Sequence, residues 1–185
     1  MSRLTVYRDD DAATPQLDTT DRHQIAATLQ AVSVRFEMWE ASRQLSRTVD
    51  DGAVMDAYRS DIERLKTECG YRSVDVLRCL PDNPKRQELR SKFLEEHTHD
   101  DDEVRFFVEG AGVFYLRVGG KVYMTLCERG DLIGVPAGTR HWFDMGPAPY
   151  FTAIRLFTTP EGWVAKFTGD PIARRFPEFK NLPAP

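Results

Sequence analysis

The sequence contains little cysteine. Its 185 residues include three cysteines, Cys69, Cys79 and Cys127. Three is an odd number, and no two of them have CxxC spacing, so neither a disulfide framework nor a zinc knuckle is indicated. We expect free thiols that are buried as small apolar side chains are.

Long apolar runs and runs of basic residues are also missing. No segment approaches the ~20 apolar residues that cross a bilayer, and the first residues, MSRLTVYRDDDAAT, lack the apolar core of a signal peptide. The net charge is −4, and Lys and Arg alternate with acids, so no basic stripe is available to bind a phosphate backbone. The sequence therefore predicts a cytoplasmic protein without a membrane or nucleic-acid partner, and we expect a monomer.

The pattern of the chain changes near residue 96. The length suits a single domain, residues 1–185, with 41% hydrophobic and 29% charged residues. Before residue 96 we expect a helical and strand annex, about residues 1–95. It contains three amphipathic helix patterns and two alternating strand patterns, at residues 20–32, 52–70 and 83–94 and at residues 34–40 and 71–80. Gly70 is predicted to end the second helix, and Pro84 to occupy the first position of the third.

From residue 96 onward the pattern is typical of β-strands. Six runs rich in β-branched and aromatic residues are separated by turns that contain glycine: EVRFFVEG, GVFYLRV, KVYMTLCE, DLIGVP, RHWFDM and YFTAIRLF. Gly119-Gly120 is a good two-residue hairpin turn. We predict a mainly β protein with flanking helices, an antiparallel jelly-roll barrel whose core spans about residues 96–158. Residues 159–185 contain five prolines and are expected to form an irregular C-terminal tail.

Histidine is scarce, yet three of the four histidines stand in one pattern. They are His97, His99 and His141, and the fourth is His23. Residues two apart on an extended segment point to the same side, so His97 and His99 can reach one point, and Glu103 has the same parity. His141 begins another strand and can close the site from across the barrel. Three imidazoles and a carboxylate suit one iron(II), nickel, manganese, copper or zinc ion per chain.

Two plainer interpretations compete with this metal site. An HxH pair beside an acidic loop is often a pair of surface histidines, but here the ligand types recur at the foot of predicted strands. Asp100, Asp101 and Asp102 resemble a calcium loop, but only superficially, because the spacing and the central glycine of an EF-hand are missing. A transition-metal site is therefore the favoured hypothesis.

These residues resemble the two motifs of the cupin family. The first motif is matched by His97-x-His99-xxx-Glu103-xxxxxx-Gly110, and the second by Gly130-xxxxx-Pro136-x-Gly138-xx-His141. The match departs at both ends, where Ser91 stands in place of a glycine and Met145 in place of an asparagine. Neither position carries a metal ligand in that family, so the resemblance implies a cupin-type barrel with an intact ligand set.

Longer stretches are similar to the acireductone dioxygenase family. They are KFLEEHTHDDDEVRFFVEGAGVFYL, LIGVPAGTRHWFDMGPAPYFTAIRLF, TPEGW (159–163) and FTGD. The likeness runs from about Arg35 to Asp170 and is most specific between residues 92 and 170. It implies an oxidoreductase of methionine salvage that cleaves 1,2-dihydroxy-3-keto-5-methylthiopentene with O₂. With Fe²⁺ the products would be 4-methylthio-2-oxobutanoate and formate, and with Ni²⁺ they would be 3-methylthiopropanoate, formate and carbon monoxide.

The resemblance also implies roles for residues near the ligands. Arg105 has the parity of Glu103, and Arg155 stands inside the apolar run FTAIRLF, so both are candidate catalytic residues that bind a substrate dianion. The alternative for each is a surface arginine with its stem on apolar neighbours. Phe93, Phe143 and Trp163 resemble the apolar lining near the substrate, the alternative being aromatic residues that only pack the core.

Two acids complete the set. Glu96 matches a family position linked to metal loading, and Asp102 matches one that relays local structural change and is grouped with the catalytic residues. Otherwise, acids at a helix end and in a polar loop would simply face solvent.

Two other function classes stay open on the same fold. A thiol dioxygenase or a metal-dependent isomerase would keep the histidines but would not need Arg105 and Arg155 beside an apolar pocket. A non-catalytic cupin that binds a sugar or a small effector often lacks a metal ligand, whereas this chain keeps all four. Because one fold hosts many functions, the choice depends on the site residues.

Overall fold

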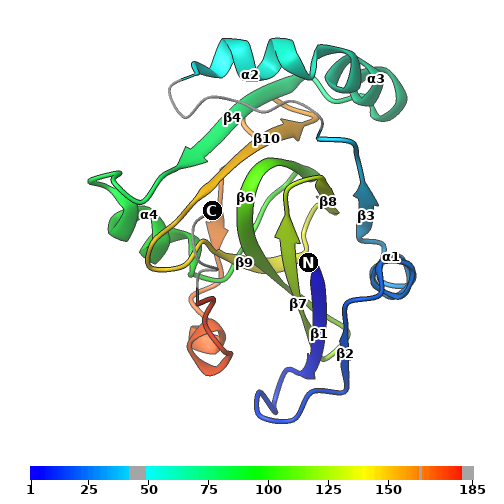
Figure 1. Cartoon of the computed structure of the whole chain (residues 1–185). Helices are drawn as coiled ribbons and strands as arrows, with labels where there is room; N and C mark the ends of the chain where they lie inside the picture. Colours follow the sequence, from blue (N-terminus) through cyan, green and yellow to red (C-terminus); the bar gives the residue numbers. More distant parts are fainter. Residues whose placement is uncertain (42–48, 163, 181–185) are drawn as a thin grey trace.

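The computed structural model describes residues 1–41, 49–162 and 164–180. Its strands form two antiparallel sheets that share the long strand β6 (Glu103–Val118) (Figure 1). The first sheet has the order β2–β1–β7–β6–β9–β5–β11, with β2 (Leu17–Thr19), β1 (Arg3–Arg8), β7 (Lys121–Glu128), β9 (Arg140–Asp144), β5 (His97–Thr98) and β11 (Lys166–Phe167). The second has the order β4–β10–β6–β8–β3, with β4 (Ser73–Cys79), β10 (Phe151–Phe157), β8 (Asp131–Val135) and β3 (Arg35–Met38).

The two halves of β6 belong to different sheets. Residues 103–110 pair with β8 and β10, whereas residues 111–118 pair with β7 and β9. The strand turns between the sheets at Gly110, whose φ is +69° and where a Cβ would lie 1.8 Å from the carbonyl oxygen of Tyr150. The prediction of two separate strands here was wrong, because this glycine bends one strand without interrupting its pairing.

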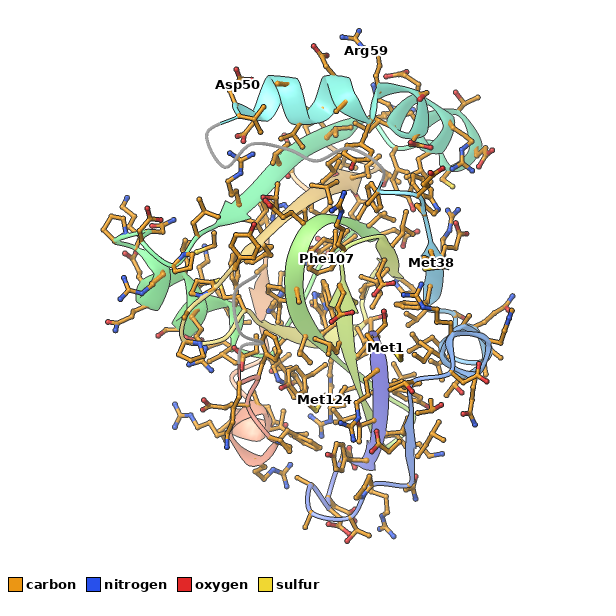
Figure 2. The ribbon with its side chains drawn as sticks, in the orientation of Figure 1. Met1, Met38, Asp50, Arg59, Phe107 and Met124 are labelled. Atoms are coloured by element: carbon orange, nitrogen blue, oxygen red, sulfur yellow. The ribbon has the colours of Figure 1, made fainter. Side chains whose placement is uncertain are left out.

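The sheets curve around a common apolar interior, which confirms the predicted mainly β jelly-roll barrel. Figure 2 shows side chains filling this interior around Phe107. The hairpin predicted at Gly119-Gly120 is present, and both glycines have positive φ, as a tight turn between β6 and β7 requires. Strand β1 was not predicted, although RLTVYR alternates in the period of a strand. It pairs with β7 along its whole length.

Helices cover the outside of the barrel. Helix α1 (Arg22–Gln30) begins where the Asp21 carboxylate accepts hydrogen bonds from two backbone N–H groups, and it buries Ile25 and Leu29. Helices α2 (Asp51–Ala57) and α3 (Arg59–Cys69) lie over the second sheet (Figure 1). One helix was predicted here, but the backbone leaves helical geometry at Tyr58 (φ −115°, ψ 20°), so there are two. Gly70 ends the second of them in the left-handed conformation, as predicted.

Helix α4 (Arg86–Phe93) starts two residues later than its proline suggested. Pro84 lies in the preceding turn, where the Asn83 side chain accepts a hydrogen bond from the backbone N–H of Lys85 at 2.9 Å. The helix packs Leu89 and Phe93 against the interior core. The helix ends at Phe93, and three residues connect it to β5, which begins at His97.

The C-terminal segment covers the outer face of the first sheet. The short 3-10 helix η1 (Pro171–Arg175) and the residues after it pack against Tyr115 and Trp142, using Ile172, Phe176 and Phe179. All three cysteines are free, and Cys69 is exposed while the other two are buried. Among the described residues, no helix has both the length and the apolar character needed to cross a membrane.

Candidate metal centre

Strand pairing brings the histidines of two motifs together. His97 on β5 lies directly opposite His141 on β9, and His99 follows β5 in the loop that leads to β6. One ring nitrogen from each of these three residues lies within 4.8 Å of the others. All three side chains are buried. A group of three buried histidines at this separation can hold a metal ion.

Each imidazole is held by a backbone carbonyl. The Nδ1 atoms of His97, His99 and His141 donate to the carbonyl oxygens of Glu95 at 2.7 Å, Val164 at 3.0 Å and Thr139 at 2.8 Å. Because a carbonyl only accepts, the proton is on Nδ1 and the lone pair of Nε2 remains available. Within the described part of the chain, the buried Nε2 of His141 has no hydrogen-bond partner. A metal ion at this point would accept the lone pair of that Nε2 atom, so the three histidines fit a bound metal ion.

Glu103, the first residue of β6, lies between the histidines and an arginine. Its Oε2 atom is 3.4 Å from Nε2 of His99 and 3.4 Å from Nε2 of His141. Its Oε1 atom accepts a hydrogen bond from Nη2 of Arg105 at 2.5 Å. The carboxylate therefore presents one oxygen to the histidine group and uses the other to hold Arg105.

Burial and charge shift the pKa values of His97 and Glu103 toward the forms that bind a metal ion, and they shift the pKa of His99 in the opposite direction. Burial lowers the pKa of His97 to about 4. Burial alone would raise the pKa of Glu103, but the charge of Arg105 and contacts with the histidines outweigh it and hold that pKa well below its usual range. For His99, burial acts to lower the pKa, and the hydrogen bond and charge of Glu103 raise it overall. Neutral His97 and ionised Glu103 are the ligand forms.

The histidines open into a cavity of about 200 Å³. Phe93 and Phe143, two of the aromatic residues expected near a substrate, line it, and Trp163 lies outside the described residues. Sequence reasoning missed two more aromatic residues of the lining, Phe114 and Phe167. Phe114 pairs with Phe143 across β6 and β9, and that pairing could be recognised only once the strands were aligned.

Arg105 is buried in the wall of this cavity. Its Cζ lies 4.4 Å from the ring centroid of Phe143 and 4.7 Å from that of Phe114. Beyond its bond to Glu103, the Nε and Nη1 atoms have no hydrogen-bond partner among the described residues. A surface arginine is excluded, because only 4% of this residue is exposed. Buried donors without a partner are rare and indicate a missing acceptor.

Arg155 also lines the cavity but already has a partner. It lies opposite Arg105 in the ladder between β10 and β6. Its Nε and Nη2 atoms donate to the two carboxylate oxygens of Asp75 at 2.8 and 2.6 Å. The site thus contains two neighbouring arginines, one of which uses a full edge of its guanidinium on a carboxylate outside the metal group.

Glu96 and Asp102 do not line the cavity. Glu96 is buried, which the solvent-facing interpretation did not anticipate, and it accepts hydrogen bonds from Thr168 at 2.7 Å and Arg117 at 3.3 Å. Asp102 is exposed and accepts a hydrogen bond from the backbone N–H of Ala137 at 2.8 Å. Each therefore fastens a segment next to a histidine.

Asp101 is a buried acid that sequence reasoning left without a role. Its carboxylate accepts hydrogen bonds from the backbone N–H of Thr159 at 2.6 Å and from the hydroxyl groups of Thr158 and Thr159. It shares the parity of His99 and Glu103, and this signal pointed to an inward side chain. Asp101 anchors the segment that leaves β10 beside the cavity.

Comparisons with known proteins agree on one family. A model described as the ARD/ARD′ family matches residues 3–165. The chain is 62% identical over 183 residues to an acireductone dioxygenase of Parvibaculum lavamentivorans, which covers 99% of this chain and 100% of that one. It is 56% identical over 177 residues to an acireductone dioxygenase of Citrobacter koseri, covering 96% and 98% of the two chains.

A solved structure gives the same result. The acireductone dioxygenase of Bacillus anthracis, with a cadmium ion in its active centre, superposes with a TM-score of 0.80 at 28% identity. The match covers 90% of this chain and 98% of that one. Family model, relatives and structure all extend over almost the whole chain, and the chain therefore belongs to the acireductone dioxygenase family.

Proposed function

We propose that this protein is a metal-dependent dioxygenase that cleaves the acireductone 1,2-dihydroxy-3-keto-5-methylthiopentene with O₂. The observation that carries the proposal is the pairing of two features in one cavity. Three histidines present their Nε2 atoms to one point, and Arg105 offers unpaired donors in the adjoining wall. An enediol that loses its protons becomes an anion, and inside a protein it needs a bound cation at one end and hydrogen-bond donors beside it.

We assign His97, His99, Glu103 and His141 as the ligands of one ion per chain, Fe²⁺ or Ni²⁺. The support is chemical: three imidazoles with free Nε2 lone pairs and one ionised carboxylate suit these ions. When bound, the ion supplies Lewis acidity and the redox chemistry that O₂ requires. The protein contributes the orientation, because the backbone carbonyls hold each ring in place.

Arg105 would bind the anionic oxygens of the substrate. Its Nε and Nη1 atoms are buried and unpartnered, so an enediolate oxygen placed there gains charge-assisted hydrogen bonds without first displacing another acceptor. Arg155 adds a second positive charge on the same wall. Phe93 and Phe143 provide the apolar surface that excludes water and receives the methylthioalkyl chain, and we propose Trp163 as part of the same lining.

Glu96 and Asp102 would act at one remove from the substrate. Glu96 directly precedes His97, and its carboxylate accepts hydrogen bonds from Thr168 and Arg117. We propose that these bonds keep β5 in place while the metal is loaded. Asp102 bonds the turn that precedes His141 to the loop that follows His99, and it can therefore transmit a local change from one ligand to another.

The proposed setting is methionine salvage in the cytoplasm, with a monomeric enzyme. With Fe²⁺ we expect 4-methylthio-2-oxobutanoate and formate. With Ni²⁺ in the same pocket we expect 3-methylthiopropanoate, formate and carbon monoxide. Both product sets contain the atoms of one acireductone and one O₂, so neither reaction requires another reductant or oxidant.

The test is to remove the metal and reload separate samples with Fe²⁺ or Ni²⁺. Each sample is given the acireductone and O₂, and the headspace gas and the acids are analysed. The iron sample should release no carbon monoxide, and the nickel sample should release one molecule for each O₂ consumed. Identical products would contradict the metal-dependent outcome, and no O₂ consumption by either sample would contradict the dioxygenase assignment.

A further inference from the structure

A row of charged side chains crosses three strands on the inner face of the second sheet. In the ladders, Asp75 on β4 lies opposite Arg155 on β10, and Arg155 lies opposite Arg105 on β6. Residues that face each other across antiparallel strands project to the same side, so the three side chains share one face. The row runs from the rim of the sheet into the wall of the cavity, since both arginines line that cavity.

Two guanidinium groups side by side in a buried wall repel each other, and each is held by a carboxylate of its own. Arg105 is paired with Glu103, and Arg155 is paired with Asp75 through two parallel hydrogen bonds of 2.8 and 2.6 Å. The proximity of Arg155 contributes to lowering the pKa of Arg105, after the larger effect of burial. The two carboxylates therefore keep both positive charges in the wall despite their repulsion.

The two ion pairs differ in where they hold the arginine. The Asp75 side chain is 45% exposed, whereas the Arg155 side chain is only 16% exposed. Asp75 therefore holds Arg155 from the rim. A two-bond pair between a carboxylate and a guanidinium sets the plane of the guanidinium as well as its position. The Nε and Nη2 edge is occupied, and Nη1 is the remaining nitrogen that a ligand in the cavity can use.

We propose that Asp75 is a positioning residue that holds the Arg155 guanidinium beside Arg105, so that the two arginines bind the anionic substrate together. This inference rests on the proposed function. Without Asp75, the long Arg155 side chain is free to turn its charge toward the solvent. A partly exposed ion pair contributes little to stability on its own, so its effect is expected in substrate binding rather than in folding.

The experiment is a double-mutant cycle on the iron-loaded enzyme with Asp75→Asn, Arg155→Gln and the double variant. Asp75→Asn should raise KM about 10-fold with kcat within about 2-fold, because a binding interaction is lost. In the Arg155→Gln background the same change should have no further effect on KM, since the two residues act as one unit. Asp75→Glu, which can still accept two hydrogen bonds, should recover part of the lost affinity.

Asp56→Asn is the matched control. Asp56 forms an ion pair with Arg59 between α2 and α3, away from the cavity, and its loss should leave KM unchanged. Equal increases in KM from Asp75→Asn in both backgrounds would overturn the proposal, as would an unchanged KM in a folded, metal-loaded variant. If Asp75→Asn does not fold, the same comparison is made with Asp75→Ser, which also removes the carboxylate. A wild-type enzyme that consumes no O₂ overturns the proposed function together with this inference, whereas an active wild type with an indifferent Asp75 overturns this inference alone.

Discussion

The two faces of the second sheet bury different kinds of side chain, apolar ones on the outer face and charged ones on the inner face. On the outer face, Val104, Phe106 and Val108 of β6 pack against helices α2 and α3 in an apolar core. On the inner face, the alternate residues Glu103 and Arg105 are equally buried but charged. Consecutive residues of one strand thus alternate between a hydrophobic contact and a polar site.

The apolar outer face contributes stability, whereas the charged inner face contributes the groups that can do chemistry. Burial of an aliphatic or aromatic side chain stabilises the fold by roughly 1.5–3 kcal/mol. A buried ion pair contributes little or nothing net, because desolvation of the charges offsets their attraction. The outer face therefore holds the sheet in place, and this support allows the inner face to keep Arg105 with unpaired donors. The predictions below test whether the two faces can be damaged independently.

The largest expected effect is the removal of a histidine from the interior. His141→Ala should reduce the metal content from about one ion per chain to near zero and abolish turnover, because a catalytic site with its metal gone loses the Lewis acid. Elemental analysis and circular dichroism of the purified variant check this. His23→Ala, which changes an exposed histidine on α1, should bind metal normally. Full metal occupancy in His141→Ala would remove this residue from the ligand set.

A large cavity on the outer face should damage stability instead. Phe106 is buried against Trp39 and Tyr58, with ring centroids 5.3 Å from each. Phe106→Ala should lower the free energy of unfolding by about 3–5 kcal/mol through lost contacts and a residual cavity. Urea unfolding of the metal-loaded protein measures this cost. The folded fraction should keep near wild-type turnover, and a loss of turnover larger than the loss of folded protein would show that the faces are coupled.

Loss of Arg105, the charged neighbour of Phe106, should reduce turnover more than stability. Arg105→Ala should reduce turnover by ~10²-fold, about 3 kcal/mol of transition-state stabilisation, by analogy with the removal of one preorganised donor. Its effect on the unfolding of the metal-loaded protein should be smaller than that of Phe106→Ala, because the bound ion still compensates the buried charge of Glu103 once Arg105 is removed. Steady-state kinetics and urea unfolding on the same samples give both values, with Arg3→Ala, an exposed arginine, as the control.

The smallest effect concerns pH and involves the outer core alone. Burial, followed by nearby negative groups, raises the pKa of Tyr71 from 10.0 to about 12. The folded protein holds the phenolic proton more tightly than the unfolded chain, so this stabilisation is complete below pH 10 and is lost as the pH rises toward 12. At pH 11 about 1 kcal/mol of this stabilisation has been lost. Tyr71→Phe should therefore show a smaller loss of stability between pH 9 and pH 11 than the wild type, and equal losses would contradict the assignment.

Much of the fold was predictable because local patterns carried it. Runs of β-branched and aromatic residues between glycine-containing turns identified β7 to β10, and Gly119-Gly120 identified a hairpin. The failures occurred where a local signal has two outcomes. Gly110 was interpreted as a break between strands, yet it bends one strand between two sheets, and the pattern at 52–70 did not reveal the interruption at Tyr58.

The sequence by itself determined the parity of the site. Two-residue spacing predicted that His97 and His99 share one side and that Glu103 and Arg105 share one face of a strand, because side chains alternate along an extended backbone. The role of each remains a prediction. Resemblance to a family, also contained in the sequence, indicated the chemistry, and the comparisons established the family.

Only the tertiary structure decided which residues meet across strands. No local pattern predicts that Asp75 lies opposite Arg155 or that Phe114 lies beside Phe143. These contacts join residues far apart in the chain, and they depend on strand order and register. Order and register are set by the packing of the whole barrel, since a shift of one residue would turn every inward side chain outward.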